Sequence, residues 1–225
     1  MTGIPLLLKS PPFQSLAELT PVTLVGHFAF GMFVHPDVPA KSVAELVAYA
    51  RANPGKLSYA TGTLGEYMTA AQFIKATEIS SVRVPYKGGA QLMPDLITGR
   101  VQMNFGPVSS GLQYAKDGRL RMLAVLLPQR SAVAPDVPTL AEAGVGSVTL
   151  PSWQALFAPP KMSPGSAERM AREVAQVLRE PKVRAQFEQQ ALQVEGSSPS
   201  ALSAVVARDL EAWRSFVREN DIPQE

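Results

Sequence analysis

The stretch LSYATGTLGEYMTAAQFIKAT, residues 57–77, predicts a strand, a glycine-containing turn and a helix in immediate succession. Its first four residues are mostly apolar, and Gly62 and Gly65 then interrupt the pattern. Apolar side chains next recur at the spacing of one helical face, at Tyr67, Ala70, Ala71 and Ile74. A helix that begins directly after a strand directs unpaired N–H groups and a partial positive charge beyond the strand end. The stretch therefore predicts either a binding place for a carboxylate or phosphate, or a plain loop-to-helix connection that binds nothing.

The composition restricts the classes of function. The chain has 225 residues, of which 46% are hydrophobic and 18% charged, and a formal charge of +2. That charge is too small to indicate nucleic-acid binding. The absence of cysteine excludes disulfides, thiolate catalysis and cysteine-based zinc sites. The apolar run at residues 6–8 is too short to span a membrane, and the first nine residues do not form a signal peptide.

Periodic segments alternate along the chain in a way that predicts parallel β-α-β units and an α/β fold. The expected strands are residues 20–34 (one strand, or two with a kink), 57–60, 81–84, 101–105, 120–126 and a strand-rich segment at 148–158. The expected helices are residues 42–53, 64–77, one over Leu92, Leu96 and Ile97, 108–116, 166–178, 182–191, and one that opens at Pro199 and buries Leu202, Val206, Leu210, Trp213 and Val217.

Several helix ends carry explicit signals. Ser42 and Glu45 form an S-x-x-E capping box, and Pro54 with Gly55 ends the same helix. Pro94 is expected in the first turn of its helix, where its missing N–H is tolerated, and Gly99 is expected to end that helix.

Three glycine-containing turns follow expected strands: TGTLGE at 61–66, YKGGA at 86–90 and FGPVSSG at 105–111. Ligands of such sheets bind beyond the carboxyl ends of the strands, so these turns contain the candidate ligand-binding residues. The candidates are Thr61, Gly62, Thr63 and Gly65 in the first turn, Tyr86, Lys87, Gly88 and Gly89 in the second, Gly106, Pro107 and Ser109 in the third, and Trp153 on the returning segment. For two of these residues the sequence favours the alternative, in which Lys87 is only solvated and Trp153 packs in the core or at a hinge.

No catalytic or metal-binding motif stands beside these turns. His27 and His35 are the only histidines, eight residues apart and without a carboxylate cluster. Neither a nucleophile elbow nor a phosphate-binding P-loop nor a zinc-protease motif occurs. We therefore expect no metal, no cofactor and no enzymatic activity.

In combination, five segments resemble the Bug-type solute-binding proteins, the extracytoplasmic receptors of tripartite tricarboxylate transporters. The segments are AELTPVTLVG (17–26), HPDVPAKSVAELVAYARANPGKLSYA (35–60), VPYKGGAQLMPDLITGRVQMNF (84–105), RSAVAPDVPTLAEAG (130–144) and SWQALFAPP (152–160). They occur in the family's order, from about residue 10 onward.

The resemblance implies a two-lobed, periplasmic-binding-protein-like fold of type II, with the ligand between the lobes. Residues 31–151 would form the second lobe and carry the ligand-binding turns. Residues 1–30 and 152–225 would be the remnant of an incomplete first lobe, because the family's opening strand and loop are absent. The resemblance also implies a periplasmic receptor for a small carboxylate, either a di- or tricarboxylate or an aromatic acid, that delivers it to membrane transporter subunits.

Two departures from the family pattern affect the expected site. Family members carry small hydroxyl residues where this chain has Glu66 and Tyr67, and Glu66 would repel a bound carboxylate. Some members carry an aspartate where this chain has Gly106, which disfavours an amino-acid ligand.

An incomplete first lobe would also leave apolar surface uncovered. That surface would include parts of Trp213 and Phe216, and exposed apolar surface promotes self-association. The chain could then be a ligand-incompetent remnant that forms homo-oligomers. It could also be a cytoplasmic effector-sensing domain, and an enzyme is the least favoured interpretation.

Overall fold

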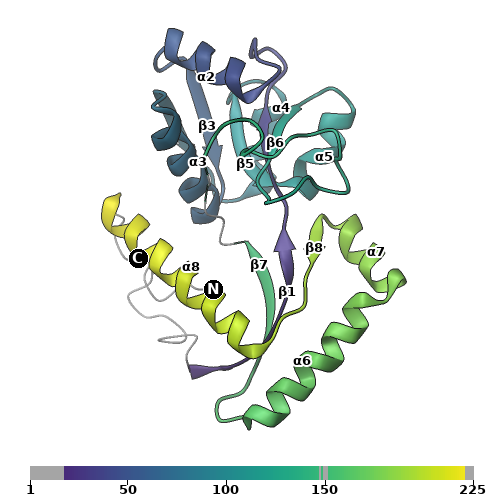
Figure 1. Cartoon of the computed structure of the whole chain (residues 1–225). Coiled ribbons are helices and arrows are strands. Elements are labelled where there is room, and N and C mark those ends of the chain that lie inside the picture. Colours follow the sequence, from purple (N-terminus) through teal and green to yellow (C-terminus); the bar gives the residue numbers. More distant parts are fainter. Residues whose placement is uncertain (1–17, 147, 149–151, 221–225) are drawn as a thin grey trace. The chain divides into compact units, whose positions relative to one another are not determined.

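A computed structural model describes residues 18–146, 148 and 152–220 (Figure 1). Backbone contacts divide the chain into two units. Unit 1 takes the chain up to His27 together with Trp153–Phe187 and Leu192–Glu225, and unit 2 takes Phe28–Ser152 with Glu188–Ala191. The two main boundaries lie within three residues of those expected, whereas the assignment of residues 188–191 to unit 2 was not anticipated. That these units are the two lobes of a receptor stays a prediction.

The centre of unit 2 is a five-stranded sheet in the order β4-β3-β5-β2-β6. Its strands are β2 (Phe30–Val34), β3 (Leu57–Thr61), β4 (Ser81–Pro85), β5 (Met103–Pro107) and β6 (Arg121–Val125). β4 and β5 run parallel to β3, as the alternation of strands and helices predicts. β2 runs antiparallel to both of its neighbours, β5 and β6. Hydrophobic periodicity indicates a strand but carries no information about its direction, so this reversal was not predictable.

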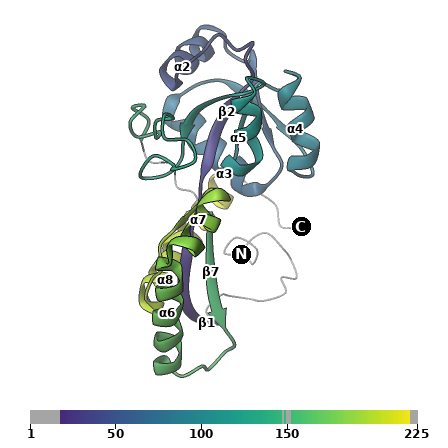
Figure 2. The same ribbon diagram turned by 90° about the vertical axis from the view of Figure 1, so that its right-hand side faces the viewer.

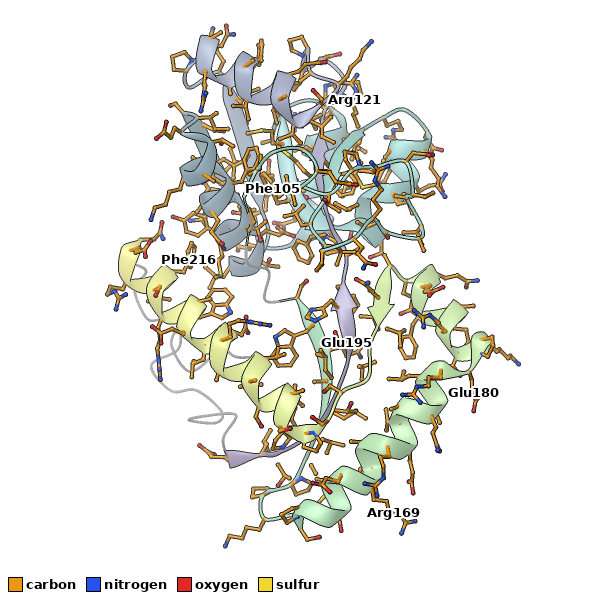
Figure 3. All side chains as sticks on the ribbon, in the orientation of Figure 1. Phe105, Arg121, Arg169, Glu180, Glu195 and Phe216 are labelled. Carbon is orange, nitrogen blue, oxygen red and sulfur yellow. The ribbon has the colours of Figure 1, made fainter. Side chains whose placement is uncertain are left out.

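Helices cover both faces of this sheet and bury two apolar clusters. α2 (Val43–Ala52) and α3 (Leu64–Thr77) pack on one face, where Phe73 lies against Phe105 with their ring centroids 5.1 Å apart. α4 (Gly89–Ile97) and α5 (Val108–Lys116) pack on the other, over Phe33, Leu92 and Leu96. Figure 1 shows α3 and α5 on opposite sides of the sheet, and Figure 3 shows Phe105 inside this core.

One local expectation in unit 2 was confirmed in part and two were wrong. Of the expected stripe of α3, Ala70 is buried and Tyr67 and Ile74 pack against the core as partly buried side chains, but the buried face also includes Glu66, Met68, Thr69, Phe73 and Thr77. Pro94 is the sixth residue of α4 and therefore lies beyond its first turn. No separate turn follows Phe105, because β5 continues through Pro107 and α5 begins at the next residue.

Unit 1 contains a three-stranded sheet in the order β7-β1-β8. The strands are β1 (Thr20–Phe28), β7 (Trp153–Ala158), which pairs antiparallel with β1, and β8 (Leu192–Val194), which was not predicted because it has only three residues. The long run at 20–34 is thus two strands, β1 and β2, separated at Ala29. The remaining helices are α6 (Pro164–Arg179), α7 (Pro181–Gln189) and α8 (Pro199–Glu219). Figure 2 shows α6 and α8 on the same face of this sheet.

The expected exposure of two aromatic rings on α8 was wrong. Trp213 and Phe216 are each only 6% exposed, and their rings pack edge to face with centroids 6.0 Å apart. The buried stripe of α8 comprises Leu202, Asp209, Trp213 and Phe216. Among the described residues, no helix is both long and apolar enough to cross a membrane.

Phe73 and Val82 provide a matched test of the core of unit 2. Phe73 is fully buried against Phe105, whereas Val82 on β4 is 54% exposed. We expect Phe73→Ala to lower the free energy of unfolding by about 3–5 kcal/mol, because it leaves a cavity between α3 and the sheet. Val82→Ala should change it by less than about 0.5 kcal/mol. Urea unfolding followed by circular dichroism measures both, and equal effects would contradict the assignment of the core.

Candidate ligand-binding rim

The carboxyl ends of β3, β4 and β5 lie at one edge of the sheet, and α3, α4 and α5 begin there. We call this edge, formed by residues 61–66, 85–91 and 105–109, the rim. The strands are neighbours and parallel, so their carboxyl ends meet at the same edge. The structure therefore brings together all three segments that contain the sequence-predicted site residues of unit 2.

The first two segments of the rim are in direct contact. Tyr86 N donates a hydrogen bond to Thr61 O at 2.8 Å. A Cβ atom added to Gly62 would lie 2.7 Å from the carbonyl carbon of Gly88, closer than side-chain carbons pack. Glycine at position 62 is thus required by the close approach of the two turns, a reason that the sequence pattern did not supply.

Asn104 connects the third segment to the first. Its Nδ2 donates to Ala60 O at 3.1 Å, from a position where the side chain is 2% exposed. A Cβ atom at Gly106 would overlap Asn104 Oδ1, so the missing side chain at Gly106 leaves the space that the Asn104 amide occupies. Asn104 was not predicted as a site residue, although a polar residue in a strand end that is otherwise buried is a recognisable signal.

The two threonine hydroxyls of the first turn already have partners within the protein. Thr61 Oγ1 is buried and accepts a hydrogen bond from Arg83 Nε at 3.1 Å. Thr63 is the N-cap of α3, and its Oγ1 accepts from Glu66 N at 3.2 Å. Both side chains therefore hold the turn in place.

Glu66 occupies the N-terminus of α3 with its own carboxylate. Oε2 accepts from Gly62 N at 2.5 Å, and the Thr63 backbone and the Asn104 side chain also donate to this carboxylate. The residue is 4% exposed. Burial raises the pKa of Glu66 above its usual value, and the three hydrogen bonds oppose that rise. At the N-terminus of α3, where residues 57–77 predicted a bound anion, the carboxylate of Glu66 from the same helix accepts the hydrogen bond of Gly62 N–H.

In the second segment, no side chain occupies the helix N-terminus. α4 begins after Gly88 with neither a side-chain cap nor an acidic residue in its first turn. Lys87 and Gly89 are exposed, and Gly88 has φ 152°, a conformation that favours glycine. Tyr86 is oriented by the hydrogen bond from its Oη to Asp95 Oδ2 at 2.9 Å. Burial raises the pKa of Tyr86, and the Asp95 carboxylate raises it further.

α5, the third helix of the rim, likewise has no side-chain cap and no acidic residue in its first turn. The N–H of Val108, its first residue, donates to Ala29 O at 2.8 Å. Ser109, the next residue, is exposed.

Arg83 is a cationic residue beside the rim that sequence reasoning missed. Its Cζ atom lies 3.7 Å from the centroid of the Tyr67 ring, and its Nε donates to Thr61 Oγ1. The ring and the hydroxyl therefore hold the guanidinium at the end of β3. The available signal was that Arg83 is the only charged residue in the strand S-V-R-V-P.

Trp153 belongs to unit 1, where it lies opposite His27 in the β1–β7 pair. Its ring centroid is 6.3 Å from that of Phe157, and its buried Nε1 has no hydrogen-bond partner within the described structure. A ligand-binding role for Trp153 stays a prediction. Over residues 18–146, 148 and 152–220, no group of three or more histidine, aspartate or glutamate residues is arranged to hold a metal ion.

The raised pKa of Glu66 predicts a specific pH dependence of stability. An acid whose pKa is raised by folding stabilises the protein most below its unfolded-state pKa, and this contribution is lost as pH rises through the folded-state pKa. Glu66→Gln retains a hydrogen-bond acceptor for Gly62 but does not titrate. As pH rises from about 4 to 8, wild-type stability should fall relative to the variant, by about 1.4 kcal/mol per unit of pKa displacement.

Urea unfolding of both proteins across this pH range measures the effect. The groups that donate to Glu66 are two backbone amides and the Asn104 amide, none of which titrates in this range. A stability difference that stays constant with pH, or that shifts towards the wild type as pH rises, would contradict the prediction.

Comparison with known proteins agrees with the sequence resemblance. The family described as the tripartite tricarboxylate transporter family receptor, TctC, matches residues 1–222. A UPF0065 protein from the tcbD-tcbE intergenic region of Pseudomonas sp. strain P51 is 30% identical over 211 residues, which are 92% of this chain and 63% of that protein. Protein BugT of Bordetella pertussis is 28% identical over 215 residues, 95% of this chain and 66% of BugT. The chain thus spans just under two thirds of the length of these two relatives.

The α/β fold of periplasmic binding proteins is confirmed by solved structures. The structure of R. palustris Rpa4515 with adipate matches with a TM-score of 0.80 and 25% identity, and the match covers 94% of this chain and 72% of that one. The match of the family to almost every residue confirms the resemblance drawn from the five sequence segments. The chain therefore belongs to the tripartite tricarboxylate transporter receptor family, whose members are substrate-binding receptors and not enzymes.

Proposed function

We propose that this chain is the ligand-binding part of a receptor for a small carboxylate, and that the carboxylate binds at the rim, at the N-terminus of α4. The observation that carries the proposal is that α4 begins at the rim with Gly88 and Gly89 and without an anion of its own. Unpaired N–H groups and the positive end of the helix dipole favour a carboxylate there. A relative with 25% identity is described with adipate, which is a small carboxylate.

Two cationic side chains strengthen this assignment. Lys87 is exposed in the turn between β4 and α4. Arg83 lies beside the same turn, because its Nε donates to Thr61, the residue whose carbonyl oxygen accepts the hydrogen bond of Tyr86 N–H. The Tyr67 ring and the Thr61 hydroxyl restrict the rotamers of Arg83, so less conformational entropy is lost when it pairs with an anion. Binding would involve charge and hydrogen bonding without any covalent step.

The remaining site residues enter the proposal with different roles. Thr61, Thr63 and Gly65 form the turn that positions Gly62 against Gly88. Tyr86, Gly106 and Ser109 line the rim, and Trp153 stays a candidate from unit 1. We further propose that the receptor acts in the periplasm and delivers its ligand to membrane subunits of a tripartite tricarboxylate transporter, because the family is defined by that system.

The competing functions have less support. Self-association was expected from uncovered apolar surface that would include Trp213 and Phe216; both of these rings are buried, whereas Leu156, Met170 and Val177 of unit 1 are exposed. Nothing in the described residues of units 1 and 2 specifically favours a cytoplasmic effector-sensing domain.

Arg83→Met tests the proposed site. Calorimetric titration of the wild type with hexanoate and with adipate should show binding of at least one of them. Arg83→Met should weaken that binding about tenfold, which is the effect of losing one charge-assisted contact. Arg119→Met is the matched control, because Arg119 also lies over a tyrosine ring, at 5.2 Å from Tyr114, but just before the amino end of β6.

The control should bind as the wild type does. If folded, monodisperse wild type binds no member of a wider panel of aliphatic and aromatic carboxylates, the proposed function is wrong for this chain. If Arg83→Met and Arg119→Met have equal effects, the carboxylate does not bind beside Arg83.

A further inference from the structure

We infer that Glu66 determines the specificity of the rim, so that it binds carboxylates with a single anionic group and discriminates against dicarboxylates. This inference rests on the proposed function and names the class of ligand for the same site. It depends on the contacts of Glu66, on its burial, and on the contrast between the N-termini of α3 and α4.

The first step is that α3 has no vacant anion position. The Glu66 carboxylate accepts a hydrogen bond from Gly62 N at 2.5 Å and also accepts from Thr63 and Asn104. A second carboxylate of a ligand would need these same donors to replace its hydrogen bonds with water at this end of the rim. A second ligand carboxylate would therefore lose its hydration shell without gaining those hydrogen bonds.

The second step concerns charge. Glu66 is 4% exposed, so water and salt screen its negative charge poorly. At neutral pH a second carboxylate at the rim would be repelled by this charge, while an uncharged end of a ligand would not be. An end that is apolar, or that donates a hydrogen bond, suits the α3 side of the rim, while the α4 side retains its preference for an anion.

The third step separates this role from ordinary helix capping. Glu45 occupies the same position in α2: its N–H donates to the N-cap Ser42 Oγ at 3.1 Å, and its Oε2 accepts from Lys41 N at 2.7 Å. Glu45, unlike Glu66, is exposed. It also lies towards the end of the sheet opposite the rim, because the segment before α2 is bound there: Arg121, the first residue of β6, donates to Ala40 O at 2.6 Å, and Figure 3 labels Arg121. The two motifs have the same local geometry, but only that of Glu66 is buried and part of the rim.

Gly106 and Asn104 complete the arrangement. The Asn104 amide reaches Glu66 from the space that a side chain at position 106 would fill, since a Cβ there would overlap Asn104 Oδ1. Glu66, Asn104 and Gly106 therefore depend on one another. The carboxylate of Glu66 can be buried because the neighbouring strand β5 supplies a hydrogen-bond donor, the Asn104 amide. The glycine at position 106 leaves room for this amide and adds no second negative charge beside Glu66.

The experiment compares hexanoate with adipate, two six-carbon acids that differ by one carboxylate. Both are titrated at pH 7 into the wild type, Glu66→Gln and Glu45→Gln. We expect the wild type to bind hexanoate at least tenfold more tightly than adipate. Glu66→Gln removes the charge and keeps one acceptor oxygen for Gly62, while its amide nitrogen replaces the second oxygen, so it should improve adipate binding about tenfold or more and change hexanoate binding less than about threefold. Glu45→Gln should change neither.

Each remaining outcome decides between the two proposals. If hexanoate binds and Glu66→Gln leaves the ratio of the two affinities unchanged, the role of Glu66 is overturned while the proposed function stands. If the wild type and both variants bind neither acid nor any other carboxylate, the proposed function fails and the inference fails with it. Adipate binding that appears only in Glu66→Gln supports the inference. Glu66→Ser, which removes both the charge and the group that fills the helix terminus, replaces Glu66→Gln if that variant does not fold, and should favour adipate more strongly.

Discussion

The parallel pairing of β3 with β4 and β5 is the constraint on which the candidate site depends. It places the ends of three strands at one edge, and the chain then enters α3, α4 and α5 from that edge. Three helix N-termini thereby become neighbours, with their partial positive charges directed the same way. The contact between Gly62 and Gly88 follows from this pairing, because Tyr86 continues the hydrogen bonding of β4 with the end of β3.

The N-termini of α3, α4 and α5 differ in which groups occupy their first N–H donors, and this difference decides where the rim can bind an anion. α3 carries a buried carboxylate with three donors, α4 has neither cap nor acid, and the first N–H of α5 is bound to Ala29. A buried acid at a helix terminus combines two opposed effects: the dipole and the hydrogen bonds favour the charge, and desolvation disfavours it. The raised pKa of Glu66 shows that desolvation is the larger effect at this position. The buried charge of Glu66 lies beside the proposed anion site at the N-terminus of α4, and it can therefore influence which anions bind there.

Much of unit 2 could be predicted because its signals are local. The Ser42 cap, the strand at 57–61 and the helix at 108–116 follow from capping residues and periodicity, and all three appear at or within one residue of the expected bounds. Two of the omissions share a cause, which is that hydrophobic patterns assume that polar residues face water. Glu66 and Thr69 are buried with local hydrogen bonds to Gly62 and Gly65, and Asn104 is buried with a tertiary hydrogen bond to Ala60, so the pattern left Glu66 and Thr69 out of the buried face of α3 and overlooked Asn104.

By itself, the amino-acid sequence determined the α/β class and the three segments that form the rim, because both depend on residue spacing along the chain, and the resemblance of five segments indicated the family. The tertiary structure alone decided which helix terminus is open. T-x-x-E at residues 63–66 and S-x-x-E at residues 42–45 are the same capping motif in the sequence. One glutamate is exposed towards the far edge of the sheet, and the other is buried at the rim beneath Gly62 and beside Asn104. The difference arises from strand order and direction, which bring residues about 40 positions apart into contact, as in the pairing of β3 with β5, and no local pattern encodes that contact.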